Sequence, residues 1–165
     1  MLRKTVLLFA LLLIGVVIVG GSFVVWFDVS AIPEPGRFET YLANEGKRLL
    51  VSREAHSVSP QEPPATSESL SSAGLTFQGV CATCHGSDGH TPSAIGKALS
   101  PRTPDLGSAE VQHWTDPELF WIIRNGIRLS GMPGFGKHLS NEQVWNLVHY
   151  LRSLQTPAQN TKSGQ

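Results

Sequence analysis

The sequence predicts an all-α protein, with a single N-terminal transmembrane helix followed by a small helical domain. Three observations lead to this fold class. Residues 5–27 are an apolar run of 23 residues without a charge. Two later segments join capping boxes to apolar residues at helical spacing. No strand-like alternation appears around the two cysteines, where a mixed α/β fold would need it.

Composition excludes several classes of protein. The 165 residues carry 13 Lys+Arg and 13 Asp+Glu, and this balance argues against a nucleic-acid binder, which should carry a net basic footprint. Two cysteines cannot build a disulfide-dense secreted scaffold. The length suits one small domain with additional segments.

The apolar run over residues 5–27 is long enough to cross a bilayer, since 23 helical residues span roughly 34 Å against a hydrocarbon core of ~30 Å. Arg3 and Lys4 precede it, so the positive-inside rule places the N-terminus in the cytoplasm. We therefore expect residues 1–27 to be a single-pass anchor in a bacterial cytoplasmic membrane, with the rest of the chain periplasmic. The alternative is a cleaved signal peptide with small residues at 20–22, although the apolar run continues past them.

The next segments separate the anchor from a compact region. Residues 28–56 are predicted to be a juxtamembrane amphipathic helical segment, which lies on a membrane or partner surface or packs on its own domain. Its apolar residues recur near the helical period: Phe38, Tyr41, Leu42, Leu49 and Leu50. Residues 57–72 hold six serines and three prolines and are expected to be a flexible linker. Residues 73–155 form the domain, and the polar residues 156–165 a disordered tail.

The two cysteines lie in the sequence Cys81-Ala82-Thr83-Cys84-His85, which is the attachment signature of a c-type haem. Two thiols three residues apart can both bond to one haem, and the adjoining histidine then faces the iron. A thioredoxin-like redox pair would need a βαβ pattern around it. A structural zinc would need a second pair of ligands, and the other histidines are not spaced as one.

Met132 is the only methionine besides the initiator, so a thioether ligand to the haem iron can only be this residue. It lies in a loop rich in glycine and proline, residues 130–136, that can hold a side chain across an open face. A loop methionine can also simply fill a gap in the core. Bis-histidine ligation through His138 or His113 is the other alternative.

Three helices are expected around this site. The first covers residues 74–82. The second runs over residues 118–125, behind the capping box that begins at Thr115 and before Gly126. The third begins after the capping box at Ser140 and ends near residue 154. Its apolar stripe comprises Val144, Leu147, Val148, Leu151 and Leu154.

These segments together resemble the mono-haem class I cytochrome c family. The matching pieces are Gly74-x-x-Phe77-x-x-x-Cys81-Ala82-Thr83-Cys84-His85-Gly86, Thr103-Pro104-Asp105-Leu106, Gly131-Met132-Pro133-Gly134-Phe135 and Val148-His149-Tyr150-Leu151-Arg152-Ser153-Leu154. The resemblance covers residues 73–155. It implies a helical haem-wrapping fold, one covalent haem c on Cys81 and Cys84, and His85 and Met132 as axial ligands. It also implies packing of the first and last helices through Gly74, Phe77 and Tyr150.

The resemblance does not decide which proline orients His85 or what three nearby cations do. In the family a proline carbonyl orients the proximal histidine, and Pro92, Pro101 and Pro104 all qualify. The cations at 124, 128 and 137 bracket the Met132 loop and are either a docking rim or ordinary solvated charges.

An iron with both axial positions filled offers no place for a substrate. The expected function is therefore electron transfer, without enzymatic activity of its own, in a bacterial respiratory or photosynthetic chain. Redox proteins or membrane complexes would be donor and acceptor. The alternative is a haem c subunit fixed within a larger membrane oxidoreductase. A ligand sensor would require a displaceable Met132.

Overall fold

The computed structural model describes residues 2–26, 30, 32, 34–58 and 62–155. The chain divides into two compact units, residues 1–31 and residues 32–165. The predicted tail, residues 156–165, lies outside the described residues, as do residues 59–61 of the predicted linker.

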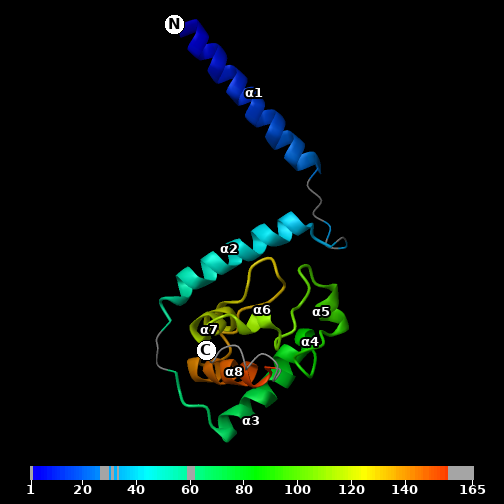
Figure 1. Ribbon diagram of the computed structural model, residues 1–165, viewed down its shortest axis with the longest axis vertical. Helices are drawn as coiled ribbons and strands as arrows, with labels where there is room; N and C mark the ends of the chain where they lie inside the picture. Colours follow the sequence, from blue (N-terminus) through cyan, green and yellow to red (C-terminus); the bar gives the residue numbers. More distant parts are fainter. Residues whose placement is uncertain (1, 27–29, 31, 33, 59–61, 156–165) are drawn as a thin grey trace. The chain divides into compact units, whose positions relative to one another are not determined.

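The first unit holds one long helix, α1 (Leu2–Trp26) (Figure 1). Its segment Arg3–Ser22 has a mean hydropathy of 2.6, and none of it is buried by other parts of the chain. Length and composition alone would let this helix cross a membrane, and a signal sequence meets the same criteria. Within the described residues it is the one helix that does so.

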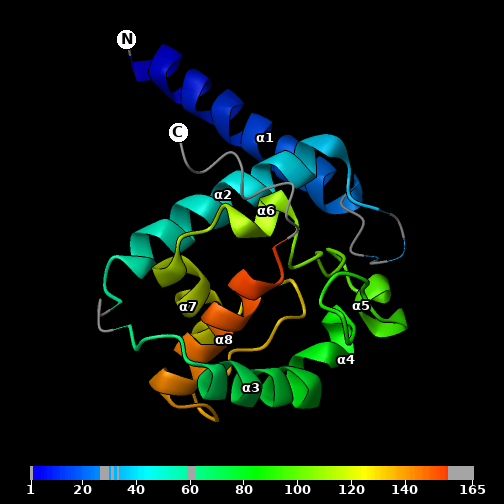
Figure 2. The same ribbon diagram turned by 60° about the horizontal axis from the view of Figure 1, so that its bottom comes forward.

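The second unit is a bundle of short helices (Figures 1 and 2). No strand occurs among the described residues, where pairing is limited to one isolated antiparallel bridge between Ile127 and Met132. The all-α prediction is therefore confirmed. In chain order the elements are α2 (Arg37–Ala55), α3 (Ser67–Thr76), η1 (Phe77–Cys81), α4 (Ala82–His85), α5 (Ala94–Ala98), α6 (Ala109–Gln112), α7 (Asp116–Asn125) and α8 (Asn141–Ser153).

Both predicted capping boxes start helices. At α8, Gln143 N donates to Ser140 Oγ at 3.2 Å while Ser140 N donates to Gln143 Oε1 at 2.8 Å. At α7, Glu118 Oε2 accepts from Thr115 N at 2.8 Å. These bonds satisfy amide groups that the first turn of a helix leaves without a partner. Helix α7 starts two residues before the predicted position 118, because Asp116 and Pro117 already take helical geometry.

The core lies between α3, α7 and α8. The predicted stripe of α8 is buried at Val144, Leu147, Val148 and Leu151, and Leu154 packs against the same core. Phe120 of α7 contacts Trp145 of α8, with ring centroids 4.6 Å apart. Burial of these side chains drives the association of helices that are individually too short to be stable.

Helix α3 crosses α8 at the contact that the family resemblance implies. The Phe77 and Tyr150 rings have centroids 5.1 Å apart, and a Cβ added at Gly74 would lie 3.4 Å from Tyr150 Cε2. The predicted packing of the first and last helices through Phe77, Tyr150 and Gly74 is confirmed, although a Cβ at Gly74 would make only an ordinary van der Waals contact.

The segment predicted as a flexible linker differs from the expectation. Helix α3 begins at Ser67, inside residues 57–72 and seven residues before the predicted start at 74. A capping box explains the early start: Ser69 N donates to Thr66 Oγ1 at 3.1 Å and Thr66 N donates to Ser69 Oγ at 2.9 Å. Serine is as good a capping residue as it is a linker residue, and composition alone does not separate the two uses.

Helix α2 packs on α7 in the same unit, so residues 57–66 join two packed elements. Val51 and Ala55 are buried, and Ser52 Oγ donates a hydrogen bond to Glu118 Oε1. Burial acts to raise the pKa of Glu118, but the hydrogen bonds from Ser52 and Thr115 outweigh it and leave that pKa lowered. The predicted apolar residues of α2 are not the packing face. They are exposed: Phe38, Tyr41, Leu42, Leu49 and Leu50.

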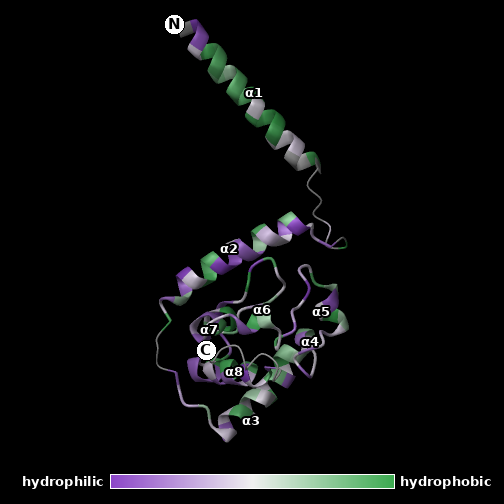
Figure 3. Ribbon diagram, viewed as in Figure 1, coloured by the Kyte–Doolittle hydropathy of each residue, from purple (hydrophilic) through white to green (hydrophobic). Residues whose placement is uncertain are grey.

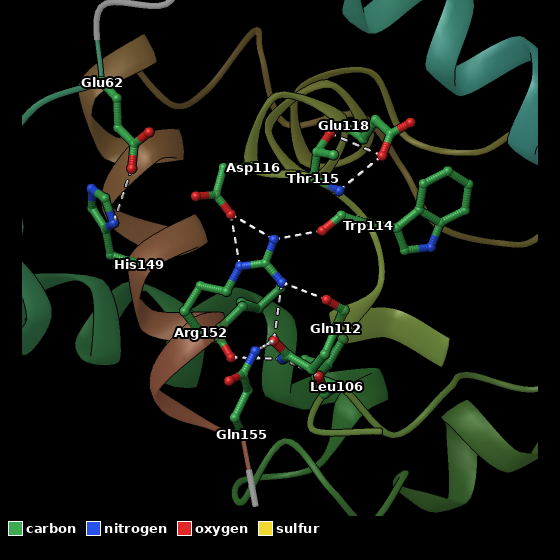
Figure 4. Close-up of polar contacts among 11 residues, drawn as sticks. Glu62, Leu106, Gln112, Trp114, Thr115, Asp116, Glu118, His149, Arg152 and Gln155 are labelled. Carbon is green, nitrogen blue, oxygen red and sulfur yellow. Dashed lines mark hydrogen bonds and ion pairs between the residues drawn. The ribbon is translucent and has the colours of Figure 1, made fainter. Parts of the chain in front are cut away.

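A polar network around Arg152 ties the end of α8 to α6 and to the start of α7 (Figure 4). The guanidinium donates through Nε to Asp116 Oδ1 at 2.7 Å and through Nη1 to the Gln112 carbonyl at 3.0 Å. Nη2 donates to the Trp114 carbonyl at 2.5 Å. Gln112 in turn donates to the Leu106 carbonyl at 2.7 Å. One planar guanidinium thus satisfies acceptors on three residues of the segment 112–116, which joins α6 to α7.

Arg152→Ala is expected to destabilise the folded domain by about 2 kcal/mol, because three or more half-buried acceptors lose their donor at once. Arg53→Ala is the matched control, since its ion pair with Glu54 is exposed and should contribute less than ~0.5 kcal/mol. Urea unfolding of both variants measures the difference. Equal midpoints would show that the Arg152 network contributes no more than a surface pair.

Candidate functional site

The predicted attachment residues lie where helix α3 continues into a wider, π-helical turn. The N–H of Ala82, directly after η1 (Phe77–Cys81), bonds to the carbonyl of Phe77, five residues earlier, which is the spacing of a π-helical turn. Cys81 closes this turn, and Cys84 and His85 belong to α4. A π-helical turn rotates the residues after it relative to those before it. Here Phe77 stays fully buried while Cys81, Cys84 and His85 lie at the edge of the core, only partly covered.

The cysteines form no disulfide. Burial, and then the neighbouring Cys84, raise the pKa of Cys81 to about 11, so its thiol stays protonated at neutral pH. A thioredoxin-like pair needs a thiolate of lowered pKa, and Cys81 has the opposite property. Among the residues that the structure describes, no group of three or more His, Cys, Asp or Glu side chains could hold a metal ion, which leaves the zinc alternative without ligands there.

The surroundings of His85 suit a side chain that could hold a metal through one nitrogen. Burial lowers the pKa of His85, which keeps the imidazole neutral, and a neutral imidazole is the form that ligates iron. Its Nδ1 atom is buried without a hydrogen bond of ordinary geometry. The Pro104 carbonyl is the backbone acceptor that faces this ring and acts to raise its pKa. Of the three candidate prolines, the structure thus places Pro104 beside His85.

The loop after α4 folds back on the attachment segment. Gly86 has φ +77°, and a Cβ there would lie 2.0 Å from the Thr91 carbonyl oxygen, so only glycine fits. Ser93 then bonds twice to α4, from N to the Cys84 carbonyl at 3.1 Å and from Oγ to the Thr83 carbonyl at 2.6 Å. The Thr103 N–H bonds to the Gly96 carbonyl at 3.1 Å. These bonds hold the loop against the attachment segment and so position Pro104, the residue after Thr103, near His85.

Met132 is held in a tight loop between α7 and α8. Ile127 N donates to the Met132 carbonyl at 3.2 Å, and Ser130 Oγ bonds to the Ile127 carbonyl at 2.7 Å. The half-buried Met132 side chain packs against the core, as does Cys81. The structure therefore brings Met132 and the attachment segment to the same core. His113 and His138, the alternative ligands, are both exposed.

The cations near this loop divide into two kinds. Arg124 is half-buried, and its Nη1 donates to Asn141 Oδ1, which gives it a structural role. Arg128 and Lys137 are exposed, so only these two are available for docking.

Sequence reasoning missed one feature of the Met132 loop. Leu129 has φ +66°, in the left-handed region that leucine rarely adopts, and its side chain is 89% exposed. The sequence around Leu129 does not predict a positive φ, because the residue is neither a glycine nor an asparagine. Such backbone strain costs about 1–2 kcal/mol and persists only where surrounding bonds enforce it.

Leu129→Asn is expected to stabilise the domain by roughly 0.5–1 kcal/mol, because asparagine tolerates the left-handed region better and no buried contact is lost. Thermal unfolding followed by circular dichroism measures this gain. A variant that unfolds at a lower temperature than the parent would mean that the leucine side chain contributes packing that offsets its strain.

Comparison with known proteins identifies a family whose model matches the haem-attachment region of this chain. Residues 70–151, about half of the chain, match the family model described as cytochrome C oxidase, cbb3-type, subunit III. No curated protein sequence matches the chain.

Two solved structures are similar to this chain, and the first of them shares its fold. That first structure is a chain of the Kuenenia stuttgartiensis reducing HAO-like protein complex Kustc0457/Kustc0458, 19% identical with a TM-score of 0.54. The match covers 59% of this chain and 48% of that one, so this chain spans about half the length of that structure. Another is the KustC0563 c-type cytochrome, 27% identical over 51% of this chain and 98% of that one, with a TM-score of 0.46.

Proposed function

We propose that this chain, whose residues 70–151 form a cytochrome c-like domain, is a membrane-tethered carrier of single electrons with one covalently bound haem c. The observation that carries the proposal is the Cys81-x-x-Cys84-His85 segment, which lies at the edge of the core with the imidazole facing a backbone carbonyl. The proposed setting is a bacterial respiratory or photosynthetic chain.

The residues present fit such a cofactor. We assign the two thioether bonds to Cys81 and Cys84, which form no disulfide. Two cysteines suffice for one doubly attached haem, which supports the mono-haem assignment. We assign His85 as one axial ligand, because burial keeps its imidazole neutral and the ring lies beside the Pro104 carbonyl, which can orient it. When bound, the haem iron supplies reversible one-electron transfer.

Met132 is the proposed second axial ligand. Its backbone is fixed by the Ile127 bridge, and its side chain is half-buried against the core that Cys81 also borders. A methionine thioether held in place by this loop would occupy the sixth coordination position of the iron, which a substrate or diatomic ligand would need. This is why we infer a carrier rather than an enzyme or a ligand sensor. Carbon monoxide binding to the reduced protein at neutral pH would contradict that inference.

We further propose that α1 is retained as a single-pass anchor with its N-terminus in the cytoplasm. Arg3 and Lys4 at its start support this orientation. The haem domain would then lie in the periplasm, within reach of redox proteins or membrane complexes as donor and acceptor. Peptides from the first 20 residues in the membrane fraction would test retention; their absence, with the haem domain present, would show cleavage.

A specific observation favours a second candidate function. The matching family model is named for a subunit of an oxidase, so the chain is alternatively a haem c subunit fixed in a larger membrane oxidoreductase. Solubilisation in mild detergent, with sizing of the haem-containing species, separates the two. A free carrier is expected to migrate alone, whereas co-migration with other subunits through successive columns would favour the fixed subunit.

A further inference from the structure

The exposed face of α2 has no partner within the part of the chain that the structure describes. Three of its apolar side chains lie within one narrow stripe, since Phe38, Leu42 and Leu49 fall roughly within 40° of one another at ~100° per residue. They are 74%, 52% and 72% exposed. The hydropathy colouring shows apolar and polar positions alternating along this helix (Figure 3). Scattered single apolar residues are ordinary on a surface, but a stripe along one helix is not.

The packing of α2 on α7 holds this stripe away from the domain. Val51 and Ala55 make the buried face, and Ser52 fixes the helix rotation through its bond to Glu118. Leu49 lies roughly 160° around the helix from Val51. If α2 used its apolar stripe for the core of its own domain, the helix would be rotated about its axis so that the stripe faced α7. The stripe is therefore built for contact outside the domain.

We propose that the stripe Phe38, Leu42 and Leu49 inserts into the surface of a lipid bilayer, so that α2 lies in the membrane interface and fixes the haem domain there. The inference rests on the proposed anchoring function of α1. It deepens that function, because it specifies that the tethered domain is held against the membrane surface.

Chain length supports lipid as the occupant. Ten residues separate the end of α1 at Trp26 from the start of α2 at Arg37. Ten residues span at most ~36 Å when fully extended. If α1 crosses the bilayer, α2 cannot leave the neighbourhood of that bilayer, and the surface always within its reach is lipid. A protein partner would have to be recruited to the same place.

The charges of α2 indicate how it would bind. Four cations (Arg37, Lys47, Arg48, Arg53) and three anions (Glu39, Glu45, Glu54) nearly cancel, and Glu45 and Arg53 lie on opposite margins of the stripe. Electrostatic attraction to anionic headgroups is therefore small, and insertion of apolar side chains must supply the affinity. The contact should depend little on headgroup charge or on salt.

The test uses nitroxide labels on the full-length holoprotein reconstituted into phosphatidylcholine vesicles, with and without phosphatidylglycerol. Single variants place the label on the stripe (Leu42→Cys, Leu49→Cys) or on the exposed opposite side (Ala43→Cys, Glu54→Cys). Collision with oxygen, which concentrates in lipid, is compared with collision with a water-soluble nickel chelate. We expect the oxygen-to-nickel ratio to be several-fold higher at 42 and 49 than at 43 and 54, in both lipid mixtures and at high salt.

Each other outcome overturns the proposal in a recognisable way. Equal ratios at all four positions would place the stripe in water. Labels at 42 and 49 shielded from both reagents would mean that a protein partner or a second copy covers the stripe. A pattern lost at high salt would point to charge rather than apolar insertion. A label at Val16→Cys checks the anchor separately: nickel access there refutes the proposed anchoring, whereas a lipid-exposed Val16 with a water-exposed stripe refutes only this inference.

Discussion

Met132→Ala is expected to abolish the sulfur-to-iron absorption band of the oxidised protein and to lower its reduction potential. A thioether ligand favours reduced iron, so its removal stabilises the oxidised form. The shift should be on the order of 0.1–0.3 V, within the ~0.8 V range that axial ligands set. The variant should also bind carbon monoxide when reduced, because the vacated position is then open. Absorption spectra and potentiometric titration measure all three effects.

Met132→Leu separates ligation from packing. Leucine keeps nearly the volume of the half-buried Met132 side chain but offers no atom that can ligate iron. Met132→Leu should therefore lose the sulfur-to-iron band and have a lowered reduction potential, as Met132→Ala does, while its domain stays more stable than that of the alanine variant. His138→Ala and His113→Ala are the controls for bis-histidine ligation, and both residues are exposed. If either histidine variant changed the spectrum while the Met132 variants did not, the axial assignment would be wrong.

Cys81→Ala and Cys84→Ala are each expected to yield poorly attached haem and little folded domain. The region that matches the family model, residues 70–151, has 82 residues, and a domain of that size reaches only ~4–12 kcal/mol of stability in total. A covalently held cofactor that binds the folded state contributes a large part of it. Cys81 packs against the core, so its loss removes a side-chain contact as well as a bond. Haem-stained gels and the circular dichroism of the purified variants measure attachment and folding.

Thr83→Ala is the matched control between the two cysteines. Its side chain is exposed, and its contribution to the loop is the backbone carbonyl that accepts from Ser93, which alanine retains. This variant should keep full haem attachment and parental stability. Loss of haem in Thr83→Ala to the same degree as in the cysteine variants would mean that the segment is simply intolerant of substitution.

Local patterns in the sequence predicted the parts of the fold that local chemistry determines. The boxes at Thr115 and Ser140 start helices because serine and threonine satisfy amides within their own turn. The stripe of α8 is buried as its period indicates. The contact of Gly74 with Tyr150 followed from the resemblance rather than from periodicity.

Other features depend on partners far along the chain, and periodicity cannot supply those. The buried face of α2 is set by its fit to α7, which places Val51 inside and leaves the larger Leu49 outside. Pro104 was indistinguishable from two other prolines until the loop after α4 brought it to His85. Arg152 reads as an ordinary charge near a helix end, yet it bonds to acceptors 36 to 40 residues away.

The central claim is that one haem c is bound covalently to this chain with His85 and Met132 as axial ligands. Intact-mass measurement combined with a reduced-minus-oxidised spectrum of the same sample tests it most directly. We expect a mass increase of one haem that persists under denaturing conditions, together with the spectrum of a six-coordinate c-type haem with a methionine ligand. A chain that retains its apoprotein mass after denaturation, or a haem spectrum without the sulfur ligand, would contradict the account.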